Sequence, residues 1–221
     1  MVLVKICGIT NLEDALAATR AGADALGFNF YKRSPRYINP ADARRIVEQL
    51  NDSVMTVGVF VNEDEPERVE RITDEVGLKA VQLHGDESPE YCLALKDRFV
   101  IKALRVGGNF SPQNVKEFEA DAILLDAFAG DVRGGTGRVV DWNVAREVSE
   151  LVPKLFLAGG LSPENISEAI AAVKPFAIDA CSSLESAPGR KDAERVRAFI
   201  EAARAAALNA SMRVDFKYRL E

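Results

Sequence analysis

The stretch VKICGIT (residues 4–10) decides the fold, because the chain changes character inside it. In its first four residues, the apolar side chains of Val4 and Ile6 alternate with the polar ones of Lys5 and Cys7. Such alternation is typical of a β-strand, in which successive residues point to opposite faces. Gly8 then interrupts the strand, and the apolar spacing of residues 11–21 is typical of a helix. A cysteine in such a strand usually packs as a small hydrophobe, so the interpretation of Cys7 depends on the rest of the chain.

The strand–turn–helix unit recurs along the chain. The strand candidates are residues 2–7, 23–30, 54–60, 78–83, 99–104, 121–126, 154–159 and 175–180. The helix candidates are residues 11–21, 40–50, 64–76, 88–97, 111–119, 141–151, 162–173 and 191–208, and those at 88, 111 and 162 open with a Ser-Pro pair that suits N-cap and first helical position. Eight strands alternating with eight helices predict parallel pairing and a closed (β/α)8 TIM barrel over residues 1–208, with the active site at its C-terminal face. An open doubly wound sheet is the alternative.

Composition narrows the class of protein. The chain has 221 residues, 48% of them hydrophobic, which suffices for one substantial core. A net charge of -6 without a Lys/Arg cluster argues against nucleic-acid and membrane-surface partners. Three cysteines without metal-type spacing argue against a disulfide framework or a metal site, and predict a cytoplasmic protein. Residues 209–221 form a tail that fits either an extra edge strand or a disordered end.

Polar residues interrupt the strands, mostly near their C-terminal ends. These residues are Lys5, Cys7, Gln82, His84, Lys102, Asp126 and Asp179. Taken singly, an aspartate at a strand end is usually a turn or cap residue, and a lone histidine is more often structural than catalytic. Together they converge on the end of the barrel where such enzymes carry out their chemistry. Their convergence predicts an active site.

Two glycine- or serine-rich turns follow the last two strands. Gly159 and Gly160 follow the seventh strand, and a loop that begins CSS (residues 181–183) follows the eighth. Backbone N–H groups in these two barrel loops often bind phosphate, and glycine lets the backbone approach the anion. A simple tight turn is the alternative for the glycine pair.

Two longer loops add to the predicted mouth of the barrel. AGDVRGGTGRVVDW (residues 129–142) fits a mobile lid, or else an ordinary long surface loop. YKRSPRYI (residues 31–38) brings Arg36 to the end of the second strand. An arginine there can hold a carboxylate through two parallel hydrogen bonds, although a solvated cationic face is the commoner role of such a run.

These stretches occur in one order over residues 2–205, as KICGIT, ALGFNFYKRSPRYI, VGVFVN, VQLHGDE, LLD, GGTG followed by DW, LAGGLSPEN and IDACSSLES. In this combination the chain resembles phosphoribosylanthranilate isomerase of tryptophan biosynthesis. The resemblance implies a (β/α)8 barrel and a cofactor-free Amadori rearrangement of N-(5-phosphoribosyl)anthranilate to 1-(2-carboxyphenylamino)-1-deoxyribulose 5-phosphate. It implies a small phosphosugar substrate as the partner, and a monomer or homodimer.

The resemblance also implies residue roles. The family's catalytic cysteine and aspartate match Cys7 and Asp126, and its carboxylate-binding arginine matches Arg36. The remaining expected contacts are His84 and Asp179 for the substrate, and Gly159, Gly160, Ser182 and Ser183 for the phosphate. No metal ligand is implied. One loop departs from the family pattern, because Cys181 stands in place of a serine and Ser183 in place of a glycine. If that glycine has positive φ or touches the phosphate, Ser183 strains the loop or weakens binding.

The implied reaction needs opposite pKa shifts in the two catalytic candidates: Asp126 must hold its proton, and Cys7 must lose its proton more readily. Asp126 would protonate the ribose ring oxygen, and Cys7 would remove the proton at C2. A free cysteine has a pKa near ~8.5, so Cys7 must become more acidic. Lys5, on the same strand face, either favours the Cys7 thiolate or neutralises Asp179.

Two alternatives stay open. One is another phosphosugar barrel isomerase, including a dual enzyme that also serves histidine synthesis; such enzymes typically use two aspartates, so Cys7 argues against it. The other is a catalytically silent barrel that has kept phosphate binding, for which the Ser183 departure leaves room.

Overall fold

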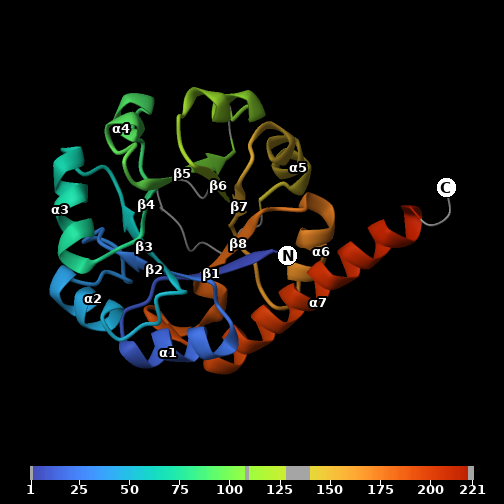
Figure 1. Cartoon of the computed structure of the whole chain (residues 1–221), viewed down its shortest axis with the longest axis horizontal. Coiled ribbons are helices and arrows are strands. Elements are labelled where there is room, and N and C mark those ends of the chain that lie inside the picture. Colours follow the sequence, from blue (N-terminus) through green and yellow to red (C-terminus); the bar gives the residue numbers. More distant parts are fainter. Residues whose placement is uncertain (1, 108–109, 128–139, 219–221) are drawn as a thin grey trace.

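A computed structural model describes residues 2–107, 110–127 and 140–218, with side chains described as far as residue 209. Eight parallel strands close into a barrel in the order of the sequence, and helices surround it (Figure 1). The strands are β1 (Leu3–Cys7), β2 (Ala25–Asn29), β3 (Met55–Phe60), β4 (Ala80–Leu83), β5 (Phe99–Val106), β6 (Ala122–Ala127), β7 (Leu155–Leu157) and β8 (Ala177–Ala180). Because β1 pairs with β8 as well as with β2, the sheet has no edge. The predicted (β/α)8 barrel is confirmed, and the open sheet is excluded.

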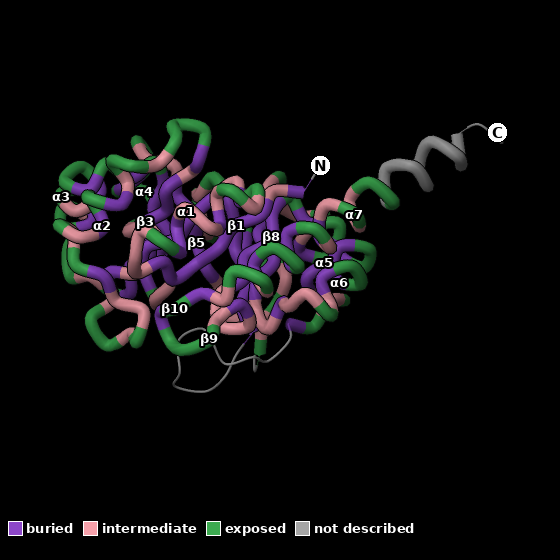
Figure 2. Tube along the Cα trace, turned by 90° about the horizontal axis from the view of Figure 1, so that it is seen from below, coloured by how far each residue is buried: buried purple, intermediate pink, exposed green. Residues whose placement is uncertain are grey.

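The connecting helices cover the outside of the barrel. They are α1 (Leu12–Ala21), α2 (Pro40–Val47), α3 (Pro66–Val76), α4 (Pro89–Ala94), the 3-10 helix η1 (Pro112–Glu117), α5 (Trp142–Leu151), α6 (Ile166–Val173) and α7 (Ala193–Tyr218). Their inner faces and the strands are buried, and their outer faces are exposed (Figure 2). Within the parts of the chain just given, no helix is long and apolar enough to cross a membrane.

Two helix predictions need correction. The predicted helix at residues 111–119 is the short 3-10 helix η1. The Asn114 side chain caps its start by accepting a hydrogen bond from the Ser111 N–H at 2.8 Å. The predicted helix start at Ser162 is four residues early, because α6 begins at Ile166. There Asn165 accepts from the Ser162 N–H at 2.9 Å and donates to the Gly160 carbonyl at 2.9 Å. Such side-chain bonds to nearby backbone compete with helix formation.

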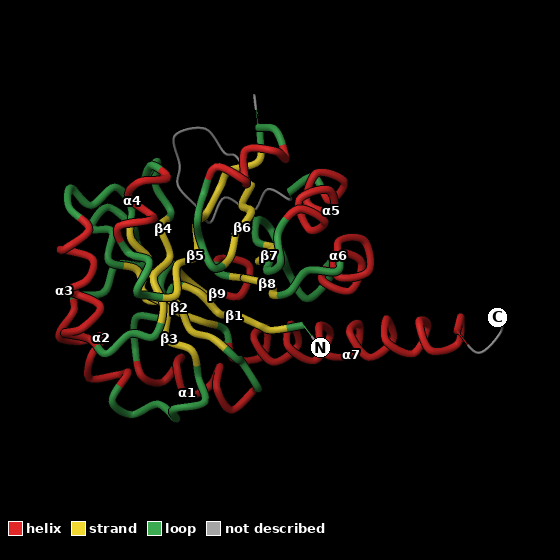
Figure 3. The backbone as a smooth tube through the Cα atoms, turned by 45° about the horizontal axis from the view of Figure 1, so that its top comes forward, coloured by secondary structure: helices red, strands yellow, loops and turns green. Residues whose placement is uncertain are grey.

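The chain after β8 holds elements that the sequence pattern did not predict. A single-turn 3-10 helix, η2 (Ser182–Leu184), precedes a short antiparallel pair, β9 (Glu185–Ala187) and β10 (Arg190–Lys191). Helix α7 then continues through residues 209–218 and projects beyond the barrel (Figure 3). The alternating tail is therefore helical over this range and does not form an edge strand. An alanine-rich stretch precedes it, and adding residues to an existing helix is easier than nucleating a new one.

Apolar residues fill the inside of the barrel and leave polar groups to its C-terminal end. The inner cluster consists of Ala25, Val57, Ala80, Ile101, Ala103, Ala122, Leu124, Phe156, Ala158 and Ala177. A larger cluster packs between the strands and the helices. This packed interior fixes the strand ends, so side chains just beyond it are held in defined positions.

Candidate active site

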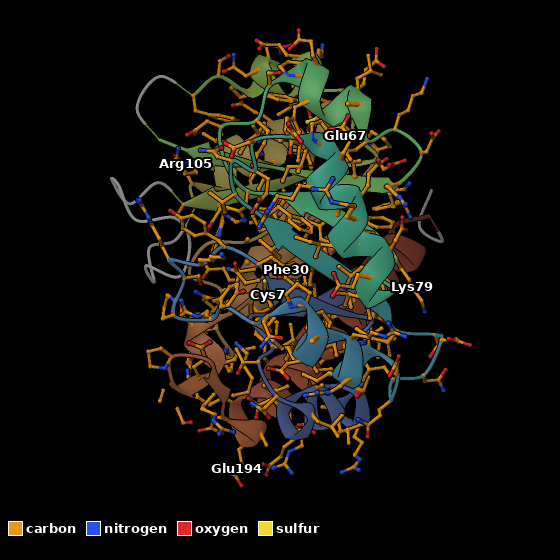
Figure 4. All side chains as sticks on the ribbon, turned by 90° about the vertical axis from the view of Figure 1, so that its left-hand side faces the viewer. Cys7, Phe30, Glu67, Lys79, Arg105 and Glu194 are labelled. Atoms are coloured by element: carbon orange, nitrogen blue, oxygen red, sulfur yellow. The ribbon has the colours of Figure 1, made fainter. Side chains whose placement is uncertain are left out.

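The strand ends and the loops that follow them surround one open cavity. All nine residues proposed from the sequence line it: Cys7, Arg36, His84, Asp126, Gly159, Gly160, Asp179, Ser182 and Ser183. Figure 4 places Cys7 toward the middle of the molecule, whereas Glu194 lies at its outer edge. The topology thus brings together residues from six strand ends at the C-terminal face, where barrel enzymes act.

Cys7 ends β1, in a position that its neighbour on β2 leaves open. Its register partner is Gly27, and a Cβ atom there would come within 2.7 Å of the Cys7 Sγ. A glycine is therefore needed opposite this thiol. The Cys7 side chain is nearly buried, with 9% of its residue surface exposed, and its exposed part faces the cavity.

Three neighbours act on the Cys7 thiol. A hydrogen bond with the Cys181 side chain, against the opposing effect of burial, lowers the pKa of Cys7 well below its ordinary value. The positive charges of Lys5 and Lys191 act in the same direction. The same hydrogen bond raises the pKa of Cys181, so the pair shares its protons unequally. Of the two thiols, Cys7 is therefore the one whose ionisation the site favours.

Lys5 and Asp179 form a buried ion pair beneath Cys7. The Lys5 Nζ lies 2.8 Å from Asp179 Oδ1, and the exposed fractions of the two side chains are 0% and 7%. Burial, which outweighs the attraction of Lys5, raises the pKa of Asp179 to about 7. Burial also opposes the charge of Lys5, but Asp179 and Cys7 together raise the pKa of this ammonium above its ordinary value. Lys5 thus combines the two roles proposed for it: it pairs with Asp179 and attracts the Cys7 thiolate.

A chain of side chains from β4 orients Asp126. The Gln82 Nε2 lies 2.7 Å from His84 Nδ1, and the His84 Nε2 lies 3.3 Å from Asp126 Oδ2. The His84 ring thus bridges the Gln82 amide and the Asp126 carboxyl group. The Ala127 N–H donates to the other oxygen, Oδ1, at 2.8 Å. Both oxygens of Asp126 are therefore held in place at the cavity wall.

Arg36 has a partner that the sequence reasoning missed. Its Nε and Nη2 donate to the Glu185 carboxylate at 2.9 and 2.8 Å. Lys191 donates to the same carboxylate at 3.0 Å and to the Cys181 carbonyl at 3.1 Å. Burial opposes the charge of Glu185, yet hydrogen bonds from Arg36 and Lys191 lower the pKa of this carboxyl group below its ordinary value. Glu185 lies within the quoted IDACSSLES stretch, but nothing in the local pattern indicates a partner 149 residues away.

Lys102, the remaining polar interruption, does not line the cavity. Its Nζ lies 2.6 Å from Glu87 Oε2 and 3.0 Å from the Gly85 carbonyl oxygen. Glu87 also accepts from the backbone N–H groups of Asn62 at 2.8 Å and Gly85 at 2.9 Å. This buried pair therefore braces the turn that follows His84.

The two expected phosphate loops lie side by side. Gly159 and Gly160 have φ of 78° and 65°, and a Cβ atom on Gly159 would come within 2.7 Å of the Ala127 nitrogen. Only glycine fits there. Ser183 lies in η2, its hydroxyl donates to the Leu161 carbonyl, and its φ is not positive. Ser183 therefore does not meet the positive-φ condition for backbone strain, and its effect on phosphate binding stays a prediction.

Comparison with known proteins identifies the family. The model of the family described as N-(5'phosphoribosyl)anthranilate (PRA) isomerase matches residues 4–202. The chain belongs to this family. It is similar to the N-(5'-phosphoribosyl)anthranilate isomerase of Trichlorobacter lovleyi, with 50% identity over 206 residues that cover 93% of this chain and all of the relative. The enzyme of that name from Thermotoga maritima is 46% identical over 205 residues, covering 92% of this chain and 99% of the relative.

Solved structures agree with this result. The crystal structure of phosphoribosyl anthranilate isomerase from Thermotoga maritima matches with a TM-score of 0.85 and 46% identity, over 93% of this chain and all of that one. A structure of the isomerase in complex with reduced 1-(o-carboxyphenylamino)-1-deoxyribulose 5-phosphate matches with a TM-score of 0.82 and 45% identity, over the same shares. The chain is thus an isomerase of tryptophan biosynthesis, as the resemblance implied.

Some expectations about this phosphoribosylanthranilate isomerase family member stay predictions. Residues 128–139, which hold most of the expected lid, lie outside the described residues. Asp141 lies in the described part of the expected lid (residues 129–142), and it caps α5 by accepting from the Asn143 N–H at 2.9 Å. A monomer and a homodimer both stay open. The predicted end of the barrel domain at residue 208 also stays a prediction.

Proposed function

We propose that the chain converts N-(5-phosphoribosyl)anthranilate to 1-(2-carboxyphenylamino)-1-deoxyribulose 5-phosphate without a cofactor, with Asp126 as general acid and Cys7 as general base. The observation that carries the proposal is the pair itself. A thiol whose pKa is lowered and a carboxyl group held at both oxygens line one cavity. Potential anion-binding groups lie in the same cavity, with Arg36 in one loop and the two phosphate loops in others.

The reaction needs one proton donor and one acceptor. Asp126 protonates the ribose ring oxygen, the C1–O bond breaks, and the anthranilate nitrogen takes up the positive charge as an iminium ion. The Cys7 thiolate removes the C2 hydrogen as a proton, and its electrons form the C1–C2 double bond of an enolamine. Tautomerisation to the ketone completes the isomerisation. A proton then passes from the Cys7 thiol to the Asp126 carboxylate through solvent, which resets both groups.

The other cavity residues hold the substrate in this scheme. Arg36, fixed by Glu185, binds the anthranilate carboxylate. Backbone N–H groups around Gly159, Gly160, Ser182 and Ser183 bind the phosphate. His84 and Asp179 contact the sugar, where Asp179 can switch between acceptor and donor because its pKa is about 7.

The experiment follows the loss of anthranilate-type fluorescence when freshly made phosphoribosylanthranilate meets the purified protein. We expect Cys7→Ala and Asp126→Asn each to lower kcat by roughly 10²- to 10⁴-fold, the range for loss of a general acid or base. Cys92→Ala is the matched control, because Cys92 is buried in α4 and does not line the cavity. Variants that keep kcat within tenfold of wild type would refute the assigned roles. A wild type that binds the product but never turns over would favour the silent barrel.

The proposal extends to cellular location. Cys7, Cys92 and Cys181 are all free thiols, which supports a reducing compartment such as the cytoplasm. Recovery of the activity in the cytosolic fraction, and not in a secreted or membrane fraction, tests this part.

A further inference from the structure

Cys7 ends β1, and Cys181 directly follows β8, the strand that pairs with β1. The register of β1 and β8 pairs Lys5 with Asp179 and Ile6 with Ala180, and Cys7 and Cys181 are the residues that directly follow this last pair. Neighbouring strands lie about 4.8 Å apart, which falls within the Cα separations of about 4.4–6.8 Å that a disulfide accepts. The backbone therefore holds the two cysteines at a distance that one S–S bond can span.

The side chains also meet. Both thiols line the cavity, and each changes the pKa of the other; the Cys181 thiol also donates to Glu185 Oε1 at 3.9 Å. The Lys5–Asp179 pair, two residues earlier on each strand, confirms that this face points into the barrel. A Cβ atom on Gly8 would come within 2.8 Å of the Cys181 Sγ, so the Cys181 thiol lies over the turn that follows Cys7. Lys191 Nζ is 3.7 Å from the same sulfur.

We propose that Cys7 and Cys181 are an oxidation site, at which a hydroperoxide converts the two thiols into a reversible intramolecular disulfide. The proposed isomerisation uses only Cys7 and leaves Cys181 without a chemical task. The disulfide gives Cys181 one, as the thiol that resolves the oxidised form of Cys7. Hydrogen peroxide or an organic hydroperoxide supplies the oxidising power.

The two steps balance. The Cys7 thiolate attacks one peroxide oxygen, the O–O bond breaks, and the other oxygen leaves as water or an alcohol after taking up a proton. Cys7 is then a sulfenic acid. The Cys181 sulfur attacks the Cys7 sulfur, the S–S bond forms, the S–O bond breaks, and the hydroxyl group leaves as water with the Cys181 proton. Two electrons pass from the two thiols to the peroxide, and a dithiol reverses the change by exchange.

The electrostatics suit this order of events. The lowered pKa of Cys7 makes it the thiolate that reacts first. Cys181 is the protonated partner, and the ammonium group of Lys191 is placed to stabilise its thiolate as it attacks. Cys92, the third thiol, is buried, and its pKa is raised to about 11 by burial, so we expect it to stay inert.

Oxidation and catalysis are measured separately. Reduced, desalted protein is treated with a small excess of hydrogen peroxide, and free thiols are counted after denaturation. We expect wild type to fall from three thiols to one, to lose two hydrogen atoms in mass, and to give a cross-linked peptide containing Cys7 and Cys181. Dithiothreitol should restore all three thiols. Cys92→Ser should still cross-link, whereas Cys181→Ser and Cys7→Ser should not.

Two results would overturn the proposal. One is oxidised wild type whose Cys7 gains two oxygen atoms as a sulfinic acid while no cross-linked peptide forms. The other is a disulfide that includes Cys92. Because the wild-type cross-link is read directly, a variant that fails to fold does not obscure the outcome. Loss of activity on cross-linking, regained with dithiothreitol, is also expected. This arm rests on the proposed role of Cys7: a cross-linked protein that stays active supports the oxidation site and contradicts the general base.

Discussion

Lys5 and Asp179 face each other in register on β1 and β8, and their 2.8 Å ion pair lies directly below the two cysteines at the mouth of the barrel. Both side chains are removed from solvent, so each charge depends on the other. The pair also places a positive charge beside the Cys7 thiolate. One interaction therefore links the stability of the barrel to the ionisation of the proposed base.

Replacing Lys5 with methionine should destabilise the fold. Removing one partner of a buried ion pair typically costs about 3–5 kcal/mol, because the other charge is left unpaired. Asp179→Asn in the Lys5→Met background should recover part of that loss. Free energies of unfolding from denaturant titration at neutral pH check both values. If the Lys5→Met variant were as stable as wild type, the ion pair would contribute nothing to stability.

The same variant predicts a pH dependence. The pKa of Asp179 is about 7 in the folded chain, against 3.8 for the free carboxyl group, and without Lys5 it should rise further. The folded state then binds more protons than the unfolded state between these values, so stability falls as the pH rises. Wild type and Lys5→Met should lose stability in parallel from about pH 4, and the variant should continue to lose it above about pH 7, where the wild-type Asp179 has ionised and its slope levels off. The variant's pH optimum for activity should also rise, because the Cys7 thiolate loses a neighbouring positive charge.

Cys181 should set the acidic limb of the activity profile. Its hydrogen bond is the largest influence that lowers the pKa of Cys7, so Cys181→Ala should move the limb of kcat/KM to higher pH. Below that limb we expect a loss of roughly tenfold, as for one hydrogen bond to a charged group. Cys181→Ser, whose hydroxyl can also donate, should lie closer to wild type. The pH dependence of Cys7 alkylation by iodoacetamide gives a second reading, and superimposable profiles for all three proteins would exclude this role.

Glu185 should act on binding through Arg36. Glu185→Gln removes the charge that holds the guanidinium group, so KM should rise about tenfold while kcat changes less. N-(5-phosphoribosyl)aniline lacks the carboxylate, and wild type and variant should turn it over equally well. Glu48→Gln is the matched control, since it breaks only the exposed pair with Arg44. A fall in kcat with unchanged KM would contradict a positioning role.

The sequence predicted the barrel because its pattern is local. Each strand is a short apolar run that ends in a turn residue, and each helix has its own period, so eight units could be counted without knowledge of contacts. The proposed site residues followed from their places at strand ends. In the structure they line one cavity because parallel strands in a closed barrel all end at the same face.

What the sequence did not predict depends on long-range or side-chain contacts. Glu185 pairs with Arg36 from a distant loop, and Cys181 meets Cys7 only because β8 closes against β1. The late start of α6 depends on two hydrogen bonds of the Asn165 side chain. Periodicity carries no information about such partners, and the β9–β10 pair is too short to show an alternating pattern.

Ser183 stands in a phosphate loop at a position where the family pattern has a glycine. The structure accommodates the serine without positive φ, and its hydroxyl binds the Leu161 carbonyl in the neighbouring loop. Ser183→Gly should therefore leave KM within about threefold of wild type and lower the free energy of unfolding by about 1 kcal/mol or more, from the lost hydrogen bond and the added freedom of glycine. Ser186→Gly is the matched control, because this exposed serine of β9 also donates to a backbone carbonyl, that of Arg190 at 3.4 Å, outside the phosphate loops. A tenfold or greater fall in KM for Ser183→Gly would mean that the serine side chain obstructs the phosphate.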